Sequence, residues 1–331
     1  MPPIAIVITS LKSNLEEVPK VIELCRANLR SRYHFTARLV MDTALHIGGG
    51  RELSTITDSP VVRDATGEPF IPGSSMKGAF RAAVERLLPV LGLRTCWLDD
   101  GRQNCLSTDS ELSRRYQVMR QQKGRKFQEN DETRQAVSAL QEAIATLDGR
   151  SPALTALGWP NWEEKIITDE HLLALLEVLL CETCKTFGSV HLVSAAFFHD
   201  LPVDGIWYDA FQVRDGVGID RDSERAREQV KYDFEVVPPQ TAFRFALTLE
   251  NPRDRDLQLV ALGLQEFVQG MVAIGGIRSR GLGRCHLKDL KVTYVDFTQD
   301  QTRQDYLVTG KMSEQDESSF IAGHMAALLG V

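Results

Sequence analysis

The stretch from Leu45 to Leu88, LHIGGGRELSTITDSPVVRDATGEPFIPGSSMKGAFRAAVERLL, sets the expectations for the whole chain. It joins a histidine to three glycines, a loop aspartate, and a Gly-Ser-Ser turn that opens an amphipathic segment. Glycine-rich turns let backbone N–H groups approach a phosphate, and a helix N-terminus adds donors and a favourable dipole. Lys77 and Arg81 lie one helical turn apart, so both cations can flank one anion. The stretch therefore indicates a phosphodiester site, although either cation could instead pair with the domain's own carboxylates.

The composition is that of an ordinary soluble globular protein, with 331 residues, 43% of them hydrophobic and 25% charged. The first residues lack the features of a signal peptide, and the most apolar run, 171–181, is too short to span a bilayer. We therefore expect a cytoplasmic protein. The formal net charge of -7 counts against nucleic-acid binding only as an average. Basic residues cluster at 114–126 and 275–295, and carboxylates at 296–317, so local basic patches are expected.

Hydrophobic periodicity predicts alternating strands and helices. The expected helices are 14–30, Ser74 or Ser75 (as the N-cap) to about Leu88, 132–147, 168–181 and 256–272; the expected strands are Arg32–Ile47, His191–His199, Ala242–Glu250 and Cys285–Phe297. Setting aside a polar block at about 97–185 leaves strand, helix, strand, strand, helix, strand. This order suggests an α+β fold with a ferredoxin-like (RRM-like) β-α-β-β-α-β core and large insertions.

A second glycine-rich segment, IGGIRSRGLGR at 274–284, lies between an expected helix and an expected strand. Its glycines permit unusual backbone angles, and Arg278, Arg280 and Arg284 can contact phosphates. No Lys-Ser/Thr pair follows and no strand precedes it, which excludes a P-loop. The segment indicates RNA contact; a merely structural tight turn is the alternative.

Four cysteines bracket the polar block. Cys96 and Cys105 stand at its beginning, and Cys181 and Cys184, at the spacing of a zinc knuckle, close it. Two thiolate pairs could complete a tetrahedral Zn²⁺ site that staples the ends of the insertion together. A redox Cys-x-x-Cys motif is the rival, with little support outside a thioredoxin-like unit.

Taken together, these motifs resemble the RAMP superfamily of CRISPR proteins, and more closely the repeated backbone subunits of type III effector complexes. The resemblance rests on LHIGGG, D-S-P-V-V-R-D, F-I-P-G-S-S-M-K-G and G-G-I-R-S-R-G-L-G, together with the F-G-S strand entry at Thr186–Asp200 and a thumb-like region at 214–240. It runs from about residue 35 to 297. The implied domains are an N-terminal helical extension (1–32), the RAMP domain (33–297, with its insertion at about 97–185 and its thumb at about 201–239) and an acidic C-terminal tail (298–331).

The resemblance also implies roles for individual residues. Asp58 occupies the place of an aspartate that supports Mg²⁺- or Mn²⁺-dependent cleavage of target RNA, and His46 that of a donor or proton shuttle near the guide backbone. Taken alone, Asp58 is better explained as a turn carboxylate that caps neighbouring N–H groups, and so is Asp64. The implied guide contacts are Gly48, Gly49, Ser74, Ser75, Lys77, Arg81, Arg278, Arg280 and Arg284.

The thumb implied by the resemblance is a hairpin that wedges into the guide–target duplex, with Val217, Ile219 and Arg221 near its tip. Subunits related to type III-D and III-E effectors carry cysteine zinc sites, which favours structural zinc here. The implied partners are crRNA, complementary target RNA, other RAMP backbone subunits and the large signature subunit. The N-terminal helix and the acidic tail depart from the minimal pattern; they either dock on neighbouring subunits or, for 298–318, are disordered.

The implied activity is that of an endoribonuclease acting on guide-paired RNA within a type III, possibly III-D-like, complex. A non-catalytic scaffold with the same fold is the first alternative. A crRNA-processing endoribonuclease is a weaker one, because such enzymes usually have two ferredoxin-like halves and this chain shows one.

Overall fold

The computed structural model describes residues 24, 26–49, 57–96, 105, 106, 110–147, 151–163, 165–219, 222 and 226–330, with the backbone alone at 217–219 and 226–231. The helix expected at 14–30 falls almost wholly outside the described residues, and so does Arg221. The chain divides into two compact units. One consists of Arg26–Thr108 and Leu180–Val331, and the other contains Asp109–Leu179.

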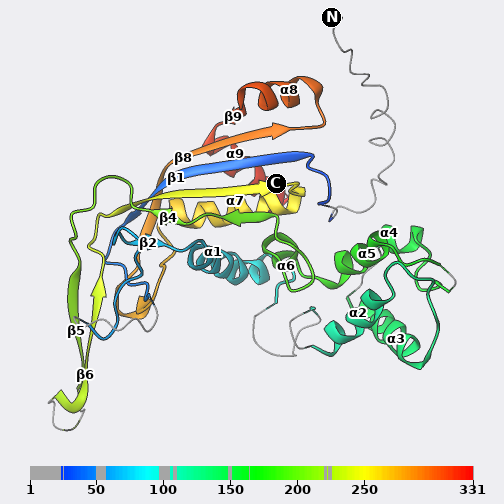
Figure 1. The fold of residues 1–331 in the computed structure, drawn as a ribbon, viewed down its shortest axis with the longest axis horizontal. Helices are drawn as coiled ribbons and strands as arrows, with labels where there is room; N and C mark the ends of the chain where they lie inside the picture. Colours follow the sequence, from blue (N-terminus) through cyan, green and yellow to red (C-terminus); the bar gives the residue numbers. More distant parts are fainter. Residues whose placement is uncertain are drawn as a thin grey trace, which may run out of the picture. The chain divides into compact units, whose positions relative to one another are not determined.

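The larger unit is built on a five-stranded sheet with the order β3-β7-β1-β8-β9, in which all neighbouring strands are antiparallel (Figure 1). Its strands are β1 (Ser31–Met41), β3 (Ala196–Phe198), β7 (Ala242–Glu250), β8 (Cys285–Asp296) and β9 (Ser313–Gln315). Its helices are α1 (Gly73–Leu87), α6 (Glu182–Phe187), α7 (Asp254–Val268), α8 (Asp300–Thr309) and α9 (Glu317–Leu329), with 3-10 turns at Leu88–Leu91 and Arg278–Arg280. The expected mixed α+β class is confirmed.

The strand predicted from Arg32 to Ile47 exists but ends at Met41. Its alternation is as expected, because Phe35, Leu39 and Met41 are fully buried. The chain leaves the sheet beyond Met41, where the Leu45 N–H donates to the Val237 carbonyl at 2.9 Å. The strand expected at His191–His199 is reduced to β3, whereas β7 has the predicted bounds.

Helices α1 and α7 pack against each other through aromatic side chains. The ring of Phe80 stacks on that of Phe267 with centroids 5.6 Å apart, and a Cβ at Gly263 would overlap Phe80. The prediction that Ser74 or Ser75 caps α1 is wrong, because Pro72 is the N-cap and no side chain caps the helix from that position. The N–H of Gly73 instead donates to Asp200 Oδ1 at 2.7 Å.

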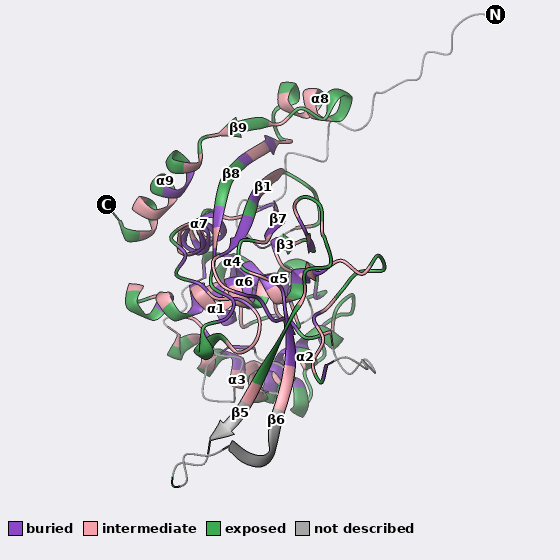
Figure 2. Cartoon of the chain, turned by 90° about the vertical axis from the view of Figure 1, so that its left-hand side faces the viewer, coloured by how far each residue is buried: buried purple, intermediate pink, exposed green. Residues whose placement is uncertain are grey.

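The acidic tail continues the fold. Strand β9 pairs with β8, and Phe320 of α9 is fully buried with its ring centroid 5.2 Å from that of Phe35. Disorder of 298–318, the alternative considered for this segment, is therefore wrong. Figure 2 shows α7 and α9 on the same side of β1 and β8.

A long hairpin, β5 (Gln212–Ile219) with β6 (Ala226–Val236), projects from the larger unit (Figure 1), and β2 (Phe70–Ile71) pairs with β4 (Leu201–Pro202). The smaller unit is helical, with α2 (Glu111–Gln121), α3 (Asp131–Thr146), α4 (Pro152–Ala156) and α5 (Asp169–Leu179). The helices expected at 132–147 and 168–181 correspond to α3 and α5. No helix in the described part of the chain is long and apolar enough to cross a membrane.

Candidate functional site

His46 lies where four segments of the larger unit meet. Its Nδ1 is 2.7 Å from the Glu235 carbonyl oxygen on β6, and its Nε2 is 3.3 Å from Ser59 Oγ. Its own carbonyl accepts the Gly276 N–H at 2.8 Å. The side chain is 8% exposed. The structure therefore brings together LHIGGG, the Asp58 loop, the second glycine loop and the hairpin, and it engages both ring nitrogens of His46 in holding them.

Asp58 is exposed and is fixed to strand β6 by a reciprocal pair of hydrogen bonds. Its N–H donates to Asp233 Oδ1 at 2.7 Å, and the Asp233 N–H donates to Asp58 Oδ2 at 3.2 Å. Asp58 Oδ1 has no partner among the residues that the structure describes. This pairing orients the carboxylate while leaving one oxygen open to solvent.

Asp64, in contrast, is engaged by its own turn. Its Oδ1 accepts from the Thr66 hydroxyl at 2.6 Å and from two backbone N–H groups. The Thr66 hydroxyl is the main reason that the pKa of Asp64 is lowered. The expectation that Asp64 is a turn residue is confirmed.

Glu235 is the second anchor of the Asp58 loop. Its side chain is buried; Oε2 accepts the Val61 N–H at 3.0 Å and Oε1 accepts from Arg63 Nη2 at 2.6 Å. Its backbone N–H donates to the Ser59 carbonyl at 3.0 Å, and the Arg63 guanidinium stacks 3.7 Å from the centroid of Phe211. Sequence reasoning missed Asp233 and Glu235. A signal was present, because a glutamate within the apolar run of β6 needs a buried partner.

The second glycine loop owes its shape to residues without side chains. Gly275 and Gly283 have φ values of +80° and +81°, and a Cβ at either would overlap a backbone carbonyl, that of His46 or that of Ile274. Of its arginines, Arg280 donates to the Tyr232 hydroxyl.

The side chains of Arg278 and Arg284 are exposed. Neither has an ion-pair or hydrogen-bond partner within the described residues. The loop that contacts His46 through Gly276 therefore presents two exposed cations without a partner among the described residues.

The residues of α1 that were predicted to contact the guide do not join the group of segments around His46. Ser74 is exposed and Ser75 half-buried, and the N–H of Gly73, next to them, already binds a carboxylate. Lys77 is half-buried, and burial, followed by the charge of Arg81, lowers its pKa. Nothing in the described contacts joins these three side chains to His46.

Arg81 binds the domain's own groups. Its guanidinium donates to Glu85 Oε1 at 2.6 Å, to the Gly188 carbonyl at 3.2 Å and to Cys184 Sγ at 3.4 Å. Burial alone would lower the pKa of Arg81, but the hydrogen bond and charge of Glu85 outweigh it and raise the pKa. This placement favours a structural role for Arg81 beside the cysteines; its predicted phosphate contact stays untested.

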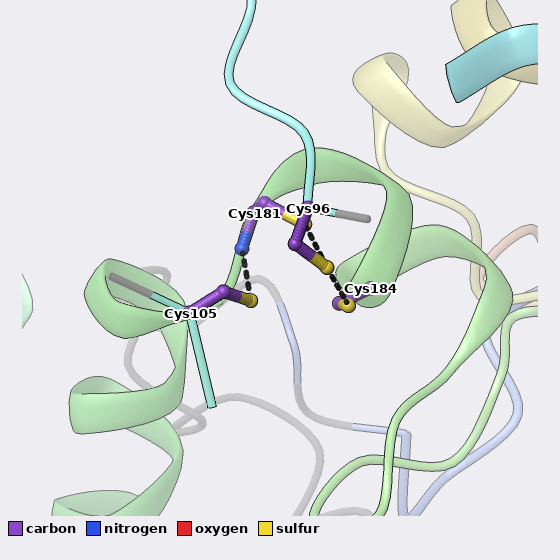
Figure 3. A group of neighbouring side chains, drawn as sticks. All are labelled: Cys96, Cys105, Cys181 and Cys184. Atoms are coloured by element: carbon purple, nitrogen blue, oxygen red, sulfur yellow. Dashed lines mark hydrogen bonds between the residues drawn. The ribbon is translucent and has the colours of Figure 1, made fainter. Parts of the chain in front are cut away.

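The four bracketing cysteines converge in the larger unit (Figure 3). Cys96, Cys105, Cys181 and Cys184 are buried, and their sulfurs all lie within 4.8 Å of one another. The sulfur of Cys96 is 3.3 Å from that of Cys184 and 3.4 Å from that of Cys181. Around zinc, with Zn–S bonds of about 2.3 Å, tetrahedral sulfurs stand about 3.8 Å apart. Donor chemistry and spacing both suit a metal such as zinc, as the sequence predicted.

Three residues, Val217, Ile219 and Arg221, were expected near the tip of the hairpin. Val217 and Ile219 belong to β5, but their side chains are not described, and Arg221 lies outside the described residues. The prediction that this tip wedges into a duplex stays a prediction.

The larger unit is thus an α+β domain that gathers two glycine loops, a loop aspartate and a projecting hairpin around one histidine (Figure 1). A family model described as the RAMP superfamily matches residues 38–286, and the chain belongs to that superfamily. Three curated relatives bear the same name, "CRISPR system Cms endoribonuclease Csm3". The one from Methanocaldococcus jannaschii is 45% identical over 71 residues, 21% of this chain and 26% of the relative.

The relative from Streptococcus thermophilus is 40% identical over 60 residues, 17% of this chain and 27% of its own length. The one from Enterococcus italicus is 46% identical over 59 residues, 17% of this chain and 28% of its own length. The chain thus spans about a quarter of the length of the curated relatives it matches.

Proposed function

We propose that this chain is a crRNA-binding backbone subunit of a type III CRISPR effector, and that it cleaves guide-paired target RNA through Asp58. The observation that carries the proposal is the convergence on His46. It places Asp58 beside strand β6 of the hairpin, and the second glycine loop, which carries Arg278 and Arg284, bonds to the same histidine through the Gly276 N–H. The similarity to proteins named as Csm3 endoribonucleases supports the same interpretation.

The proposal includes a ferredoxin-like core. Taking β1, α1, β3, β7, α7 and β8 in chain order gives β-α-β-β-α-β, and the sheet order β3-β7-β1-β8 with antiparallel neighbours is the order that such a core requires. The hairpin β5–β6 is then the thumb, and the segment over Asp109–Leu179 is an inserted domain.

In this proposal the guide is held through its backbone. Arg278 and Arg284 supply charge, and Gly48 and Gly49 supply a stretch of chain without side chains, since Gly49 and Val62 bridge the two loop strands through backbone hydrogen bonds to Pro60 and Ile47. Contacts to phosphate carry no sequence information, so target choice falls to base pairing.

Asp58 then acts on the target strand. Its free oxygen and its exposure suit a hydrated Mg²⁺ or Mn²⁺, which takes one or two carboxylates and keeps several waters. Such an ion, when bound, would neutralise charge at the scissile phosphate. Asp233 positions Asp58, and Asp58 can alternatively orient the ribose 2′-OH as the nucleophile.

The cysteine cluster is proposed to hold structural Zn²⁺. All four ligands would be thiolates, which leaves no open coordination position and therefore no catalytic role. The remaining partners in this proposal are complementary target RNA, other RAMP backbone subunits and the large signature subunit.

The test is target cleavage by the assembled complex with guide and labelled complementary RNA, in Mg²⁺ and in EDTA. Asp58→Ala is expected to lose a specific cut, about 100-fold or more in rate, while binding is unchanged. Asp64→Asn is the matched control, because it removes an exposed aspartate from the same segment. Cutting that persists in Asp58→Ala, or that is lost equally in Asp64→Asn, would refute the assignment.

One observation favours a second candidate, a non-catalytic scaffold. The Oδ2 of Asp58 accepts a backbone N–H from β6, which is what a purely structural turn carboxylate would do. The scaffold predicts that Asp58→Asn, which keeps an oxygen acceptor, leaves target RNA cleavage unchanged. Catalysis predicts that the same substitution abolishes the cut.

A further inference from the structure

The second face of the sheet, opposite α7 and α9, carries a row of basic side chains. Arg284, directly before β8, and His286 and Lys288 within it fall on this face at alternate positions. The alternation is interrupted at Asp289, where the backbone φ is +55°. Lys288 and Asp289 are both exposed, and the next residue, Leu290, is buried in the core. This irregularity shifts the alternation, so that Lys291 joins the same face as Lys288.

The row extends across three strands. In the sheet register Arg38 of β1 stands opposite Arg244 of β7 on one side and Lys288 of β8 on the other, and Thr36 stands opposite Lys291. Like charges directly opposite on neighbouring strands are destabilising. Two members of the row have carboxylate partners: Arg38 pairs with Asp204 at 2.6 Å and with Asp289 at 4.0 Å, and His286 Nδ1 lies 2.8 Å from Asp42 Oδ1.

Arg244, Lys288 and Lys291 are exposed, and within the described residues they make no ion pair. A sheet face that carries several cations without carboxylate partners is suited to an anionic ligand, because the ligand would reduce the repulsion among them. At the loop end the row begins with Arg284, which is part of the second glycine loop.

A cavity lies further along the same face. It has a volume of about 490 Å³ and is lined in part by Arg32, His34, Phe197, His199 and Thr248. His34 Nδ1 and His199 Nε2 lie 3.2 Å and 3.1 Å from the same Thr248 hydroxyl, which holds the two imidazoles together. Phe197 is 40% exposed. Rings beside hydrogen-bonding groups, in a cavity of this size, suit a nucleobase.

We propose that this face binds single-stranded RNA, with phosphates along the row of Arg244, Lys288 and Lys291 and a base in the cavity beside Phe197. Along β1, Arg38 and His34 are four residues apart, about 14 Å at 3.4 Å per residue, so a few nucleotides reach from the row to the cavity. An acidic protein surface would use the cations but not the cavity, which is why RNA is favoured. The inference shares an RNA ligand with the proposed function but requires neither Asp58 nor cleavage.

The first test measures binding of a fluorescent uridine oligonucleotide to the full chain by anisotropy, over a range of salt concentrations. Lys288→Glu/Lys291→Glu is expected to weaken binding about tenfold or more and to flatten the salt dependence by about one unit of slope for each phosphate that is no longer neutralised. Arg86→Glu/Arg134→Glu is the matched control, with the same change in net charge; both arginines are exposed, on α1 and α3, and lie outside the two basic clusters. Phe197→Ala is expected to weaken binding about fivefold or more.

A second measurement locates the RNA. Photo-crosslinking of 4-thiouridine RNA is expected to label the peptide that contains β3 in the wild type and in Asp58→Ala, but not in Lys288→Glu/Lys291→Glu. Unchanged affinity in that double variant, or equal losses in it and in the control pair, would overturn the proposal. So would unchanged RNA binding accompanied by lost self-association in sedimentation, because the face would then contact protein. Loss of cleavage in Asp58→Ala with this crosslink absent would support the proposed function and refute this inference.

Discussion

Glu235 offers the sharpest test of how the Asp58 loop is held. Its carboxylate takes the Val61 N–H and the Arg63 guanidinium on separate oxygens, and its side chain is 7% exposed whereas that of Arg63 is 37% exposed. Glu235→Ala removes both acceptors. The Val61 N–H then stays buried without a partner, while Arg63 can turn toward water.

The expected cost follows from these environments. An unsatisfied buried N–H costs about 1–3 kcal/mol. The ion pair adds about 1 kcal/mol, well below the value for a fully buried pair, because Arg63 is partly solvated. We therefore expect Glu235→Ala to lower the free energy of unfolding by about 3 kcal/mol. Glu235→Gln keeps an oxygen for one donor and loses the charge, so about 1 kcal/mol is expected.

Urea unfolding measures the change in the free energy of unfolding. Target cleavage at saturating RNA measures the effect on the position of the Asp58 loop. Glu235→Gln is expected to slow cleavage about tenfold with RNA affinity unchanged, because the loop that carries Asp58 is less well positioned. Glu314→Gln, at an exposed position on β9, serves as the control and is expected to change stability by less than about 0.5 kcal/mol.

A double-mutant cycle of Glu235→Gln with Arg63→Gln should give a coupling energy of about 1 kcal/mol. A coupling near zero would mean that the pair is solvated. A loss below about 0.5 kcal/mol for Glu235→Ala would refute the reasoning altogether.

Three further outcomes are expected. Cys181→Ser should abolish zinc binding, measured by atomic absorption, and lower the unfolding midpoint by about 5 °C or more; full zinc content in the variant would contradict the site. Gly263→Ala should destabilise the fold by about 2 kcal/mol in urea unfolding, since its Cβ would overlap Phe80, whereas Gly323→Ala on α9, with open space at its Cβ, should be neutral or stabilising. A loss at Gly323 as large as that at Gly263 would argue against the overlap. Burial, helped by the charge of His199, lowers the pKa of His34 below 6.5, so its contribution to stability is full above pH 6.5 and is lost as pH falls toward the lowered value. Thermal midpoints between pH 5 and 7 should show a smaller pH dependence in His34→Gln, and an identical dependence would exclude His34 as its source.

Much of the core could be predicted because its strands and helices follow the hydrophobic period closely. The bounds of β7 were predicted without error, and α7 was found with its end misplaced by four residues. Local signals were insufficient where partners come from far along the chain. Ser74 and Ser75 look like helix caps, yet Asp200, 127 residues from Gly73, supplies the carboxylate. The order of the tail depends on burying Phe320 against the sheet, which no local pattern shows.

The candidate site residues were named from the sequence, but the residues that hold the segments of the site together were not. Both glycine loops and the four cysteines were identified from residue type and order, whereas the roles proposed for His46 and Asp58 came from the family resemblance. Asp233 and Glu235 were not, because they act by holding another segment rather than by chemistry of their own. For Arg81 the spacing from Lys77 was compatible with phosphate or with a carboxylate. The structure shows its guanidinium bonded to Glu85 and Cys184, and the phosphate contact stays a prediction.

The hydrogen bonds made by Asp233 and Glu235 fix the position of the Asp58 loop within the larger unit. The Asp58 loop is bonded to β6 through Asp233 and through both the backbone and the side chain of Glu235. It is also bonded to the segment that follows β1, through His46 and Gly49. Most of these hydrogen bonds join the loop to Asp233 and Glu235 of strand β6. A displacement of this part of β6 would therefore also move Asp58. A duplex that moved the hairpin would thereby reposition the carboxylate. Shortening β5 and β6 by the same number of residues at the tip should preserve the loop bonds, and with them the fold, while removing this coupling.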